Sequence, residues 1–241
     1  MGAPIRWKSS RLLGVSVAMT VTAGATAGPG GMIAVTSDYV VRGVSQTQGN
    51  GALQADLHWD FPRGFSAGAF ASQVEFLPHE RSTEIDGYLQ WHGALNADFD
   101  LGASATHYGY PGDPRPINYD YDELALSLVW RDQLRIAASW IPSLDLYSFE
   151  DGLATNRQAY TLEAGWHRDL AKWADLSAGL GFYDPVGLDY ASYGYGDVTL
   201  GLKYGHWRMN LAWIWVQDSA HRQYSLGPAG GPLAVTLAWA F

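Results

Sequence analysis

The last ten residues, 232–241, alternate strictly between large apolar and small side chains, and this period constrains the fold more than any other feature. Leu233, Val235, Leu237, Trp239 and Phe241 share one parity, and Ala234, Thr236, Ala238 and Ala240 share the other. A repeat of two residues indicates a β-strand with one apolar face. A half-buried strand of a soluble sheet has the same alternation as a strand of a membrane barrel. The rest of the chain must decide between these two folds.

The same period recurs along the chain. Between Leu53 and Phe61, apolar residues alternate with Gln54, Asp56, His58 and Asp60. Four consecutive polar side chains on one face suit a water-facing lumen and not a dry sandwich core. Roughly twelve such segments of about ten residues follow one another, and about ten residues is the length that crosses a bilayer at ~45° tilt. We therefore predict an all-β fold, a closed antiparallel transmembrane β-barrel of 12 strands.

The connections between these segments alternate in length. Short turns follow the even strands and longer loops follow the odd ones, which is typical of short periplasmic turns and long extracellular loops. The first strand is expected over about 33–44, a loop over 77–83, and the longest connection over 142–157. Because an open edge is unfavourable in lipid, the first strand should pair with the last.

Aromatic residues support the membrane interpretation. In each strand that descends toward the periplasm, an outward aromatic residue stands at the end, where amphipathic rings lie among lipid headgroups. This expected aromatic girdle comprises Trp59, Phe61, Trp91, Trp130, Trp166, Tyr204, Trp239 and Phe241. A terminal Phe after alternating apolar residues also resembles the C-terminal signature of bacterial outer-membrane barrels, which implies recognition by the barrel assembly machinery through Phe241.

The N-terminus has the pattern of a secretory signal peptide. Arg6, Lys8 and Arg11 precede a mainly apolar run that is too short to span a bilayer, and Ala25-Thr26-Ala27 offers a cleavage site. We therefore expect a signal peptide over 1–27 and a barrel domain over 28–241, placed in the bacterial outer membrane.

Charge and composition exclude several classes of function. Removing the three leader cations from the 15 Lys and Arg leaves 12 bases against 24 acids, which argues against nucleic acid as a partner. The chain has no cysteine and no H-E-x-x-H pattern, so we expect no metal and no cofactor. Outer-membrane lipid and lipopolysaccharide are the expected surroundings.

Three short motifs resemble a known family. The segment 37–46 (SDYVVRGVSQ) resembles the opening signature of the proteobacterial TorF porin family, 84–88 (EIDGY) its second block, and 108–112 (YGYPG) with 121–123 its third. The resemblance covers most of the chain after the leader and fades from Trp166 onward. It implies a porin-like barrel and supplies no catalytic or ligand residue.

The inward parity supplies the candidate functional residues, and acids outnumber bases among them. Rings of acidic side chains favour cations in a pore. The predicted pore-lining set is Asp38, Arg42, Gln54, Asp56, His58, Gln73, Glu75, Glu84, Asp86, Gln90, Glu123, Arg135, Glu163, Asp197, Lys203 and Arg208. We expect a narrow channel for small solutes that prefers cations. The alternative is a lumen blocked by paired charges or by an inserted loop.

Two other classes of function stay open at this stage. A hydrolase at the outer rim would need Ser, His and an acid at one height, and the seven His are scattered, so we predict no enzyme. A structural or surface-recognition protein would instead use its long loops, and sequence alone does not separate that role from a channel.

Overall fold

The computed structural model describes residues 27–77, 80–111, 119–147, 154–186, 192–223 and 232–241. The predicted signal peptide, 1–27, lies outside these residues except for Ala27. Within the described part of the chain, no helix is both long and apolar enough to cross a membrane.

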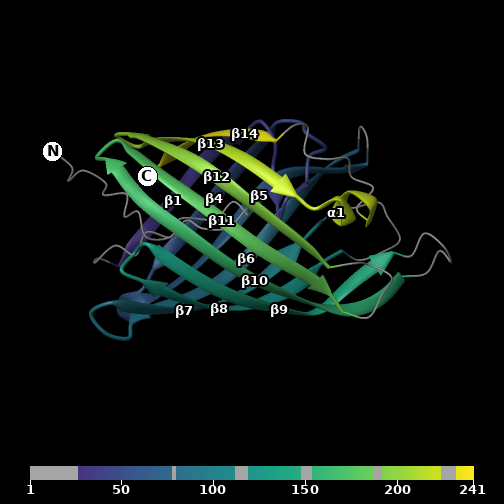
Figure 1. Ribbon diagram of the computed structural model, residues 1–241, viewed down its shortest axis with the longest axis horizontal. Coiled ribbons are helices and arrows are strands. Elements are labelled where there is room, and N and C mark those ends of the chain that lie inside the picture. The colour runs from purple at the N-terminus through teal and green to yellow at the C-terminus, as the bar shows by residue number, and fades with distance from the viewer. Residues whose placement is uncertain (1–26, 78–79, 112–118, 148–153, 187–191, 224–231) are drawn as a thin grey trace.

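Twelve strands of the described chain form one closed antiparallel barrel, as predicted (Figure 1). Each strand pairs with its neighbours in chain order, and β1 pairs with β14 to close the sheet. The barrel strands are β1 (Gly28–Thr36), β4 (Ala52–Asp60), β5 (Phe65–Leu77), β6 (Glu80–Ala94), β7 (Phe99–Gly109), β8 (Tyr121–Trp130), β9 (Leu134–Tyr147), β10 (Ala154–Ala171), β11 (Ala174–Pro185), β12 (Tyr193–Tyr204), β13 (Trp207–Val216) and β14 (Leu233–Ala240).

The first and last strands are paired from Met32 opposite Ala240 to Thr36 opposite Thr236. Ile33 lies opposite Trp239 and Val35 opposite Leu237, so apolar residues meet on the outer face. The amides of Gly31 and Phe241 donate to each other's carbonyl oxygens at 3.2 and 3.0 Å. This pairing satisfies the backbone groups that an open edge would leave unbonded in lipid.

The outer wall is apolar, which the alternation predicted. Leu126 is 69% exposed and Leu57 is 61% exposed, whereas Asp56 and Glu123 lie inside the barrel. In the girdle, Trp91, Trp130 and Trp166 are half-buried on the wall. The exposed girdle residues are Trp59, Phe61, Tyr204, Trp239 and Phe241. A closed barrel with an apolar exterior places the protein in the bacterial outer membrane.

The two rims differ in the length of their connections. At the periplasmic rim the turns are short, as in the 3-10 turn η1 (Pro62–Gly64) and at 131–133 and 205–206. At the outer rim lie the longer connections, including the helix α1 (Asp218–Gln223), which Figure 1 places at the end opposite the C-terminus.

Two outer loops are shorter than expected. The strands β5 and β6 continue to Leu77 and from Glu80, so most of the predicted loop 77–83 is strand. Likewise β9 reaches Tyr147 and β10 starts at Ala154, within the predicted loop 142–157. The predicted bounds of these two loops were wrong because a strand that continues beyond the membrane keeps its backbone pairing while its side chains become polar.

The first strand is the main correction to the sequence interpretation. It ends at Thr36 and not near Val44, and the chain then turns into the barrel. Residues 37–51, here called the inserted loop, contain the small hairpin of β2 (Val40–Val41) and β3 (Val44–Ser45). The predicted pore-lining residues Asp38 and Arg42 therefore belong to this loop and not to the barrel wall.

Candidate functional site

The hairpin of the inserted loop has a tight turn at its tip that its sequence specifies. Arg42 and Gly43 connect β2 to β3 with φ values of 51° and 78°, and two positive φ values are typical of a type I′ hairpin turn. A Cβ on Gly43 would lie 2.8 Å from Cβ of Val216 on β13. Only glycine therefore combines this backbone conformation with such a close approach to the barrel wall.

Asp38 organises the polar interior of the inserted loop. Its Oδ1 accepts hydrogen bonds from the hydroxyls of Ser45, at 2.6 Å, and Thr47, at 2.8 Å. The Thr47 hydroxyl also accepts the amide of Tyr39 at 3.1 Å. All four side chains are buried. Asp38 thus holds the loop in shape and does not line the wall of a pore.

Apolar contacts attach the inserted loop to opposite sides of the barrel. On one side, Tyr39 packs on Phe70 of β5, with ring centroids 6.0 Å apart, and belongs to a buried cluster with Val74. On the other side, Val40 belongs to a second buried cluster with residues of β9–β14 and α1. Its other members are Ile141, Ala159, Tyr183, Tyr193, Tyr195, Ile214, Ala220 and Ala234.

Two polar contacts fasten the same loop. Nη2 of Arg42 donates to both carboxylate oxygens of Glu123 on β8, at 2.7 and 2.6 Å. The Tyr39 hydroxyl donates to Oε1 of Glu84 on β6 at 2.6 Å. Burial alone would lower the pKa of the Arg42 guanidinium, but the Glu123 carboxylate and nearby tyrosines raise that pKa well above its ordinary value. The arginine therefore stays charged.

These contacts place the inserted loop across the lumen near its outer end. Its attachments to β5, β6, β8 and β9–β14 come from all around the barrel. A solute path through the barrel in this conformation is therefore narrowed at the outer end by the loop itself.

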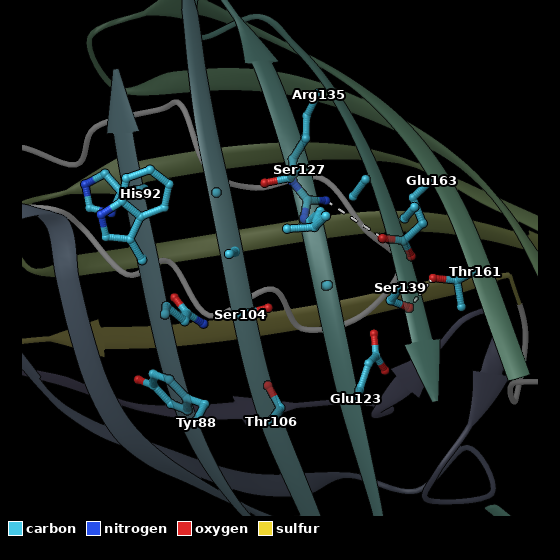
Figure 2. Close-up of a pocket in the computed structure, with 18 of the residues that line it drawn as sticks. Tyr88, His92, Ser104, Thr106, Glu123, Ser127, Arg135, Ser139, Thr161 and Glu163 are labelled. Carbon is cyan, nitrogen blue, oxygen red and sulfur yellow. Dashed lines mark hydrogen bonds and ion pairs between the residues drawn. The ribbon is translucent and has the colours of Figure 1, made fainter. Parts of the chain in front are cut away.

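A cavity of about 290 Å³ lies inside the barrel beside the inserted loop (Figure 2). Arg42 and Tyr39 line it at the loop, and Asp132, in the turn after β8, lines it at the periplasmic rim. Its walls come from β5–β10, and many of the side chains that line them carry a hydroxyl group. These are Tyr88, Ser104, Thr106, Tyr108, Ser127, Ser139 and Thr161.

Acidic side chains outnumber Lys and Arg among the residues that line the cavity. The acidic lining residues are Asp86, Asp100, Glu123, Asp132 and Glu163. The Lys and Arg residues that line it are Arg42 and Arg135. Arg135 lies 3.8 Å from Glu163 across β9 and β10, a loose pair drawn in Figure 2. The same Glu163 accepts the hydroxyl of Tyr195 at 2.7 Å.

The other side of the lumen is filled by an ion-pair network. Asp175 on β11 is fully buried and lies 2.9 Å from Nζ of Lys203 and 2.8 Å from Nη2 of Arg208. His167 on β10 lies 3.9 Å from the same carboxylate. These groups balance one another, and none of them lines the cavity.

A third polar cluster lies on β4 and its neighbours. Asp56 contacts Nδ1 of His58 at 2.6 Å and accepts the Tyr88 hydroxyl at 2.8 Å. Next to it, the amide of Gln54 donates to Ser72 at 3.2 Å. The cluster has the acid and histidine of a hydrolase but no hydroxyl nucleophile bonded to the histidine in the described residues.

The remaining predicted site residues fall in three places. Glu84, Asp86, Gln90, Glu123, Arg135, Glu163, Asp197, Lys203 and Arg208 point into the lumen from the wall. Glu75 is buried beneath the inserted loop, whose Asn50 donates to it at 3.1 Å. Gln73 was predicted to line the pore, and this prediction is wrong. Its side chain is exposed, and Phe70 and Val74 of the same strand point inward.

The error on β5 has a physical cause. Parity analysis assigns the aromatic residues to lipid, but Phe70 and Val74 pack against Tyr39 of the inserted loop, which needs an apolar partner inside the lumen. Tyr39 shares the parity of the exposed Ile33 and Val35, which alternation assigns to lipid, but it is buried inside the barrel. The dipeptide Arg42-Gly43 between valine-rich pairs is a hairpin signal that could have revealed the loop.

No group of three or more His, Cys, Asp or Glu side chains that could hold a metal ion occurs among the residues that the structure describes. The geometry instead defines an outer-membrane β-barrel with a polar, partly filled lumen. The chain belongs to the family described as "Bacterial protein of unknown function (Gcw_chp)", whose model matches residues 21–232. The likeness of its three short motifs to the TorF porin family remains a resemblance.

Solved structures with the same fold include two of a porin. The structure described as "KdgM porin" has a TM-score of 0.54 at 12% identity and covers 88% of this chain and 98% of that chain. A second, "KdgM porin in complex with disordered oligogalacturonate", has a TM-score of 0.51 at 10% identity and covers 88% and 96%. At these identities the likeness concerns the fold alone. The comparison with curated proteins finds no match.

Proposed function

We propose that this protein is a porin-like diffusion channel that prefers small cations and small neutral hydrophilic solutes. The observation that carries the proposal is the cavity of about 290 Å³ inside the barrel, which is hydroxyl-rich and extends from the inserted loop to the periplasmic rim. A barrel with only a structural role has no need of such a space.

The charge balance of the cavity supports the preference for cations. Its five acids exceed its two Arg, and both Arg are already paired with acids, Arg42 with Glu123 and Arg135 with Glu163. Acidic side chains in a pore attract cations and repel anions. One KdgM structure contains oligogalacturonate, a polymer of acidic sugars. An acid-rich cavity disfavours such a polyanion, so we propose a different solute class here.

The test is electrical. Purified protein in a planar bilayer should give discrete conductance steps, and a KCl gradient should give a reversal potential with the sign of a cation-selective pore. Arg42→Ala should increase the conductance, because it releases the inserted loop. Arg131→Ala is the matched control, since it removes an exposed Arg–Asp98 pair at the rim, with Nε 2.7 Å from the carboxylate.

A second candidate function is a barrel with a permanently closed lumen that acts through its outer loops. The contacts of the inserted loop on opposite walls favour it. The same recordings separate the two candidates. The channel proposal fails if neither the wild type nor Arg42→Ala gives conductance steps, and the closed-lumen role then takes its place.

A further inference from the structure

Two Arg–Glu pairs line the cavity, and they differ in how far their charges face its interior. In the pair of Arg42 and Glu123, one guanidinium nitrogen lies 2.7 and 2.6 Å from the two carboxylate oxygens, and the side chains are only 10% and 11% exposed. In the pair of Arg135 and Glu163, Nη1 lies 3.8 Å from Oε2, beyond hydrogen-bond length, and the side chains are 26% and 17% exposed. A tight pair cancels most of its own field, whereas a loose pair that faces the cavity presents each charge separately to a passing ion.

Glu163 is held in place by the wall behind it. Its Oε1 accepts the hydroxyl of Tyr195 on β12 at 2.7 Å. Tyr195 is buried in the apolar cluster that also contains Val40 of the inserted loop, so this donor is firmly packed. The carboxylate therefore has a defined position, and its second oxygen is the one that faces Arg135.

Of the two Arg residues that line the cavity, Arg135 lies nearer the periplasm. It is the second residue of β9 and follows the periplasmic turn at 131–133, whereas Arg42 enters from the inserted loop at the outer end. Asp132 in that turn lines the same cavity. Figure 2 shows the side chain of Arg135 extending from β9 toward Glu163 on β10. An ion that crosses the cavity between its two ends therefore passes close to this guanidinium.

The wall beside this pair is built from small side chains. Gly102, Ser127 and Ala137 line the cavity on β7, β8 and β9. They are register partners in one row that ends at Glu163 on β10. A Cβ on Gly102 would lie only 2.6 Å from Oγ of Ser127, so a larger residue would fill this part of the wall. The small members of the row leave the space that the cavity occupies, and Glu163 with Arg135 supplies the charges that face it.

We propose that Arg135 and Glu163 together set the charge selectivity of the channel, with Arg135 as the residue that limits its preference for cations. The guanidinium repels cations and attracts anions, and the carboxylate does the reverse. Because the pair is loose, removal of one partner leaves the field of the other acting in the cavity. This inference rests on the proposed function as a channel, and it names the residues that determine which ions pass.

The experiment compares reversal potentials in planar bilayers under a KCl gradient, with the full chain and its variants. Arg135→Gln should raise the ratio of K⁺ to Cl⁻ permeability roughly fivefold, the factor that one unit charge about 4 Å away produces in water. Glu163→Gln should lower the same ratio by a similar factor. The double variant Arg135→Gln/Glu163→Gln removes one charge of each sign, so its ratio should return toward the wild-type value. Arg131→Gln is the matched control, because it removes the same charge at the same end of the barrel from an exposed pair with Asp98. It should leave the ratio unchanged.

Each result decides the proposal. It is overturned if neither single variant shifts the permeability ratio, if both shift it in the same direction, or if Arg131→Gln shifts it as far as Arg135→Gln. The two single variants carry opposite predictions, so one that fails to fold leaves the other as a test. Conductance steps with wild-type selectivity in the folded variants would overturn this inference and retain the channel. Absence of steps in both the wild type and Arg42→Ala would remove the channel and this inference with it.

Discussion

Arg42 at the tip of the inserted loop and Glu123 on the wall of β8 form a buried ion pair across the lumen, with one guanidinium nitrogen 2.7 and 2.6 Å from the two carboxylate oxygens. The two residues are 81 positions apart in the chain. The pair joins the loop that narrows the barrel to the strand that lines the cavity, so it determines both the stability of the loop and the charge beside it.

Exchanging the two charges should separate these roles. Arg42→Glu alone places two acids together and should lower the free energy of unfolding by about 3–5 kcal/mol, the usual cost of breaking a buried pair. It should also increase conductance. The double variant Arg42→Glu/Glu123→Arg should restore most of the lost stability and return the conductance toward the wild-type value, which a double-mutant cycle in planar bilayers and in urea titrations would measure. Additive effects of the two changes would show that the pair does not hold the loop.

Gly43 offers a way to displace the loop without changing any charge. Gly43→Val adds a side chain at φ 78° and at 2.8 Å from Cβ of Val216, so the hairpin must move away from β13. Positive φ in a β-branched residue alone costs on the order of 1–3 kcal/mol. We expect higher conductance with unchanged ion selectivity. Gly205→Val is a suitable comparison, since Gly205 also has a positive φ, of 59°, but open space around its Cβ. Equal conductance in the two variants would argue against a loop that narrows the lumen.

Asp175 should be the most important single charge for stability. Asp175→Asn leaves Lys203 and Arg208 inside the barrel without their shared carboxylate, which should lower the free energy of unfolding by about 3–5 kcal/mol. The exposed pair of Asp98 and Arg131 gives the control, and Asp98→Asn should cost at most about 1 kcal/mol. Denaturant titrations followed by tryptophan fluorescence would measure both. Similar values for the two variants would contradict the role assigned to burial.

The outer wall should respond to charge according to depth in the membrane. Leu126 in the middle of β8 is 69% exposed, and Leu126→Arg should cost about 2–4 kcal/mol in a lipid bilayer. Leu134, the first residue of β9 at the periplasmic rim, is 44% exposed, and Leu134→Arg should cost about 0–1 kcal/mol. Refolding into vesicles gives both numbers. A cost that does not depend on depth would contradict the placement of these strands in lipid.

The barrel could be predicted from the sequence because lipid and lumen impose opposite demands on alternate residues. Leu237 is exposed on the wall as predicted, and Glu123 is inside. The pairing of β1 with β14 follows from the cost of unbonded backbone groups in lipid, which no particular side chain decides.

The candidate site could be predicted only in part. Alternation indicated that Asp86 and Glu163 face inward, but it says nothing about which inward residues share a cavity. It failed at Tyr39 and at Phe70, because the inserted loop brings its own apolar core into a lumen expected to be polar. Which acids of the cavity are paired depends on where Arg42 and Arg135 lie, and that placement is set by strands far apart in the sequence.

The inserted loop also constrains the order in which the barrel can mature. Val40 shares one buried cluster with Ala159 on β10 and Ala234 on β14, so its packing requires strands from the last part of the chain. Val40 therefore cannot complete this packing until the last strands have formed. A chain that ends before β14 would lack part of this apolar cluster and leave Val40 less protected from water and from periplasmic proteases.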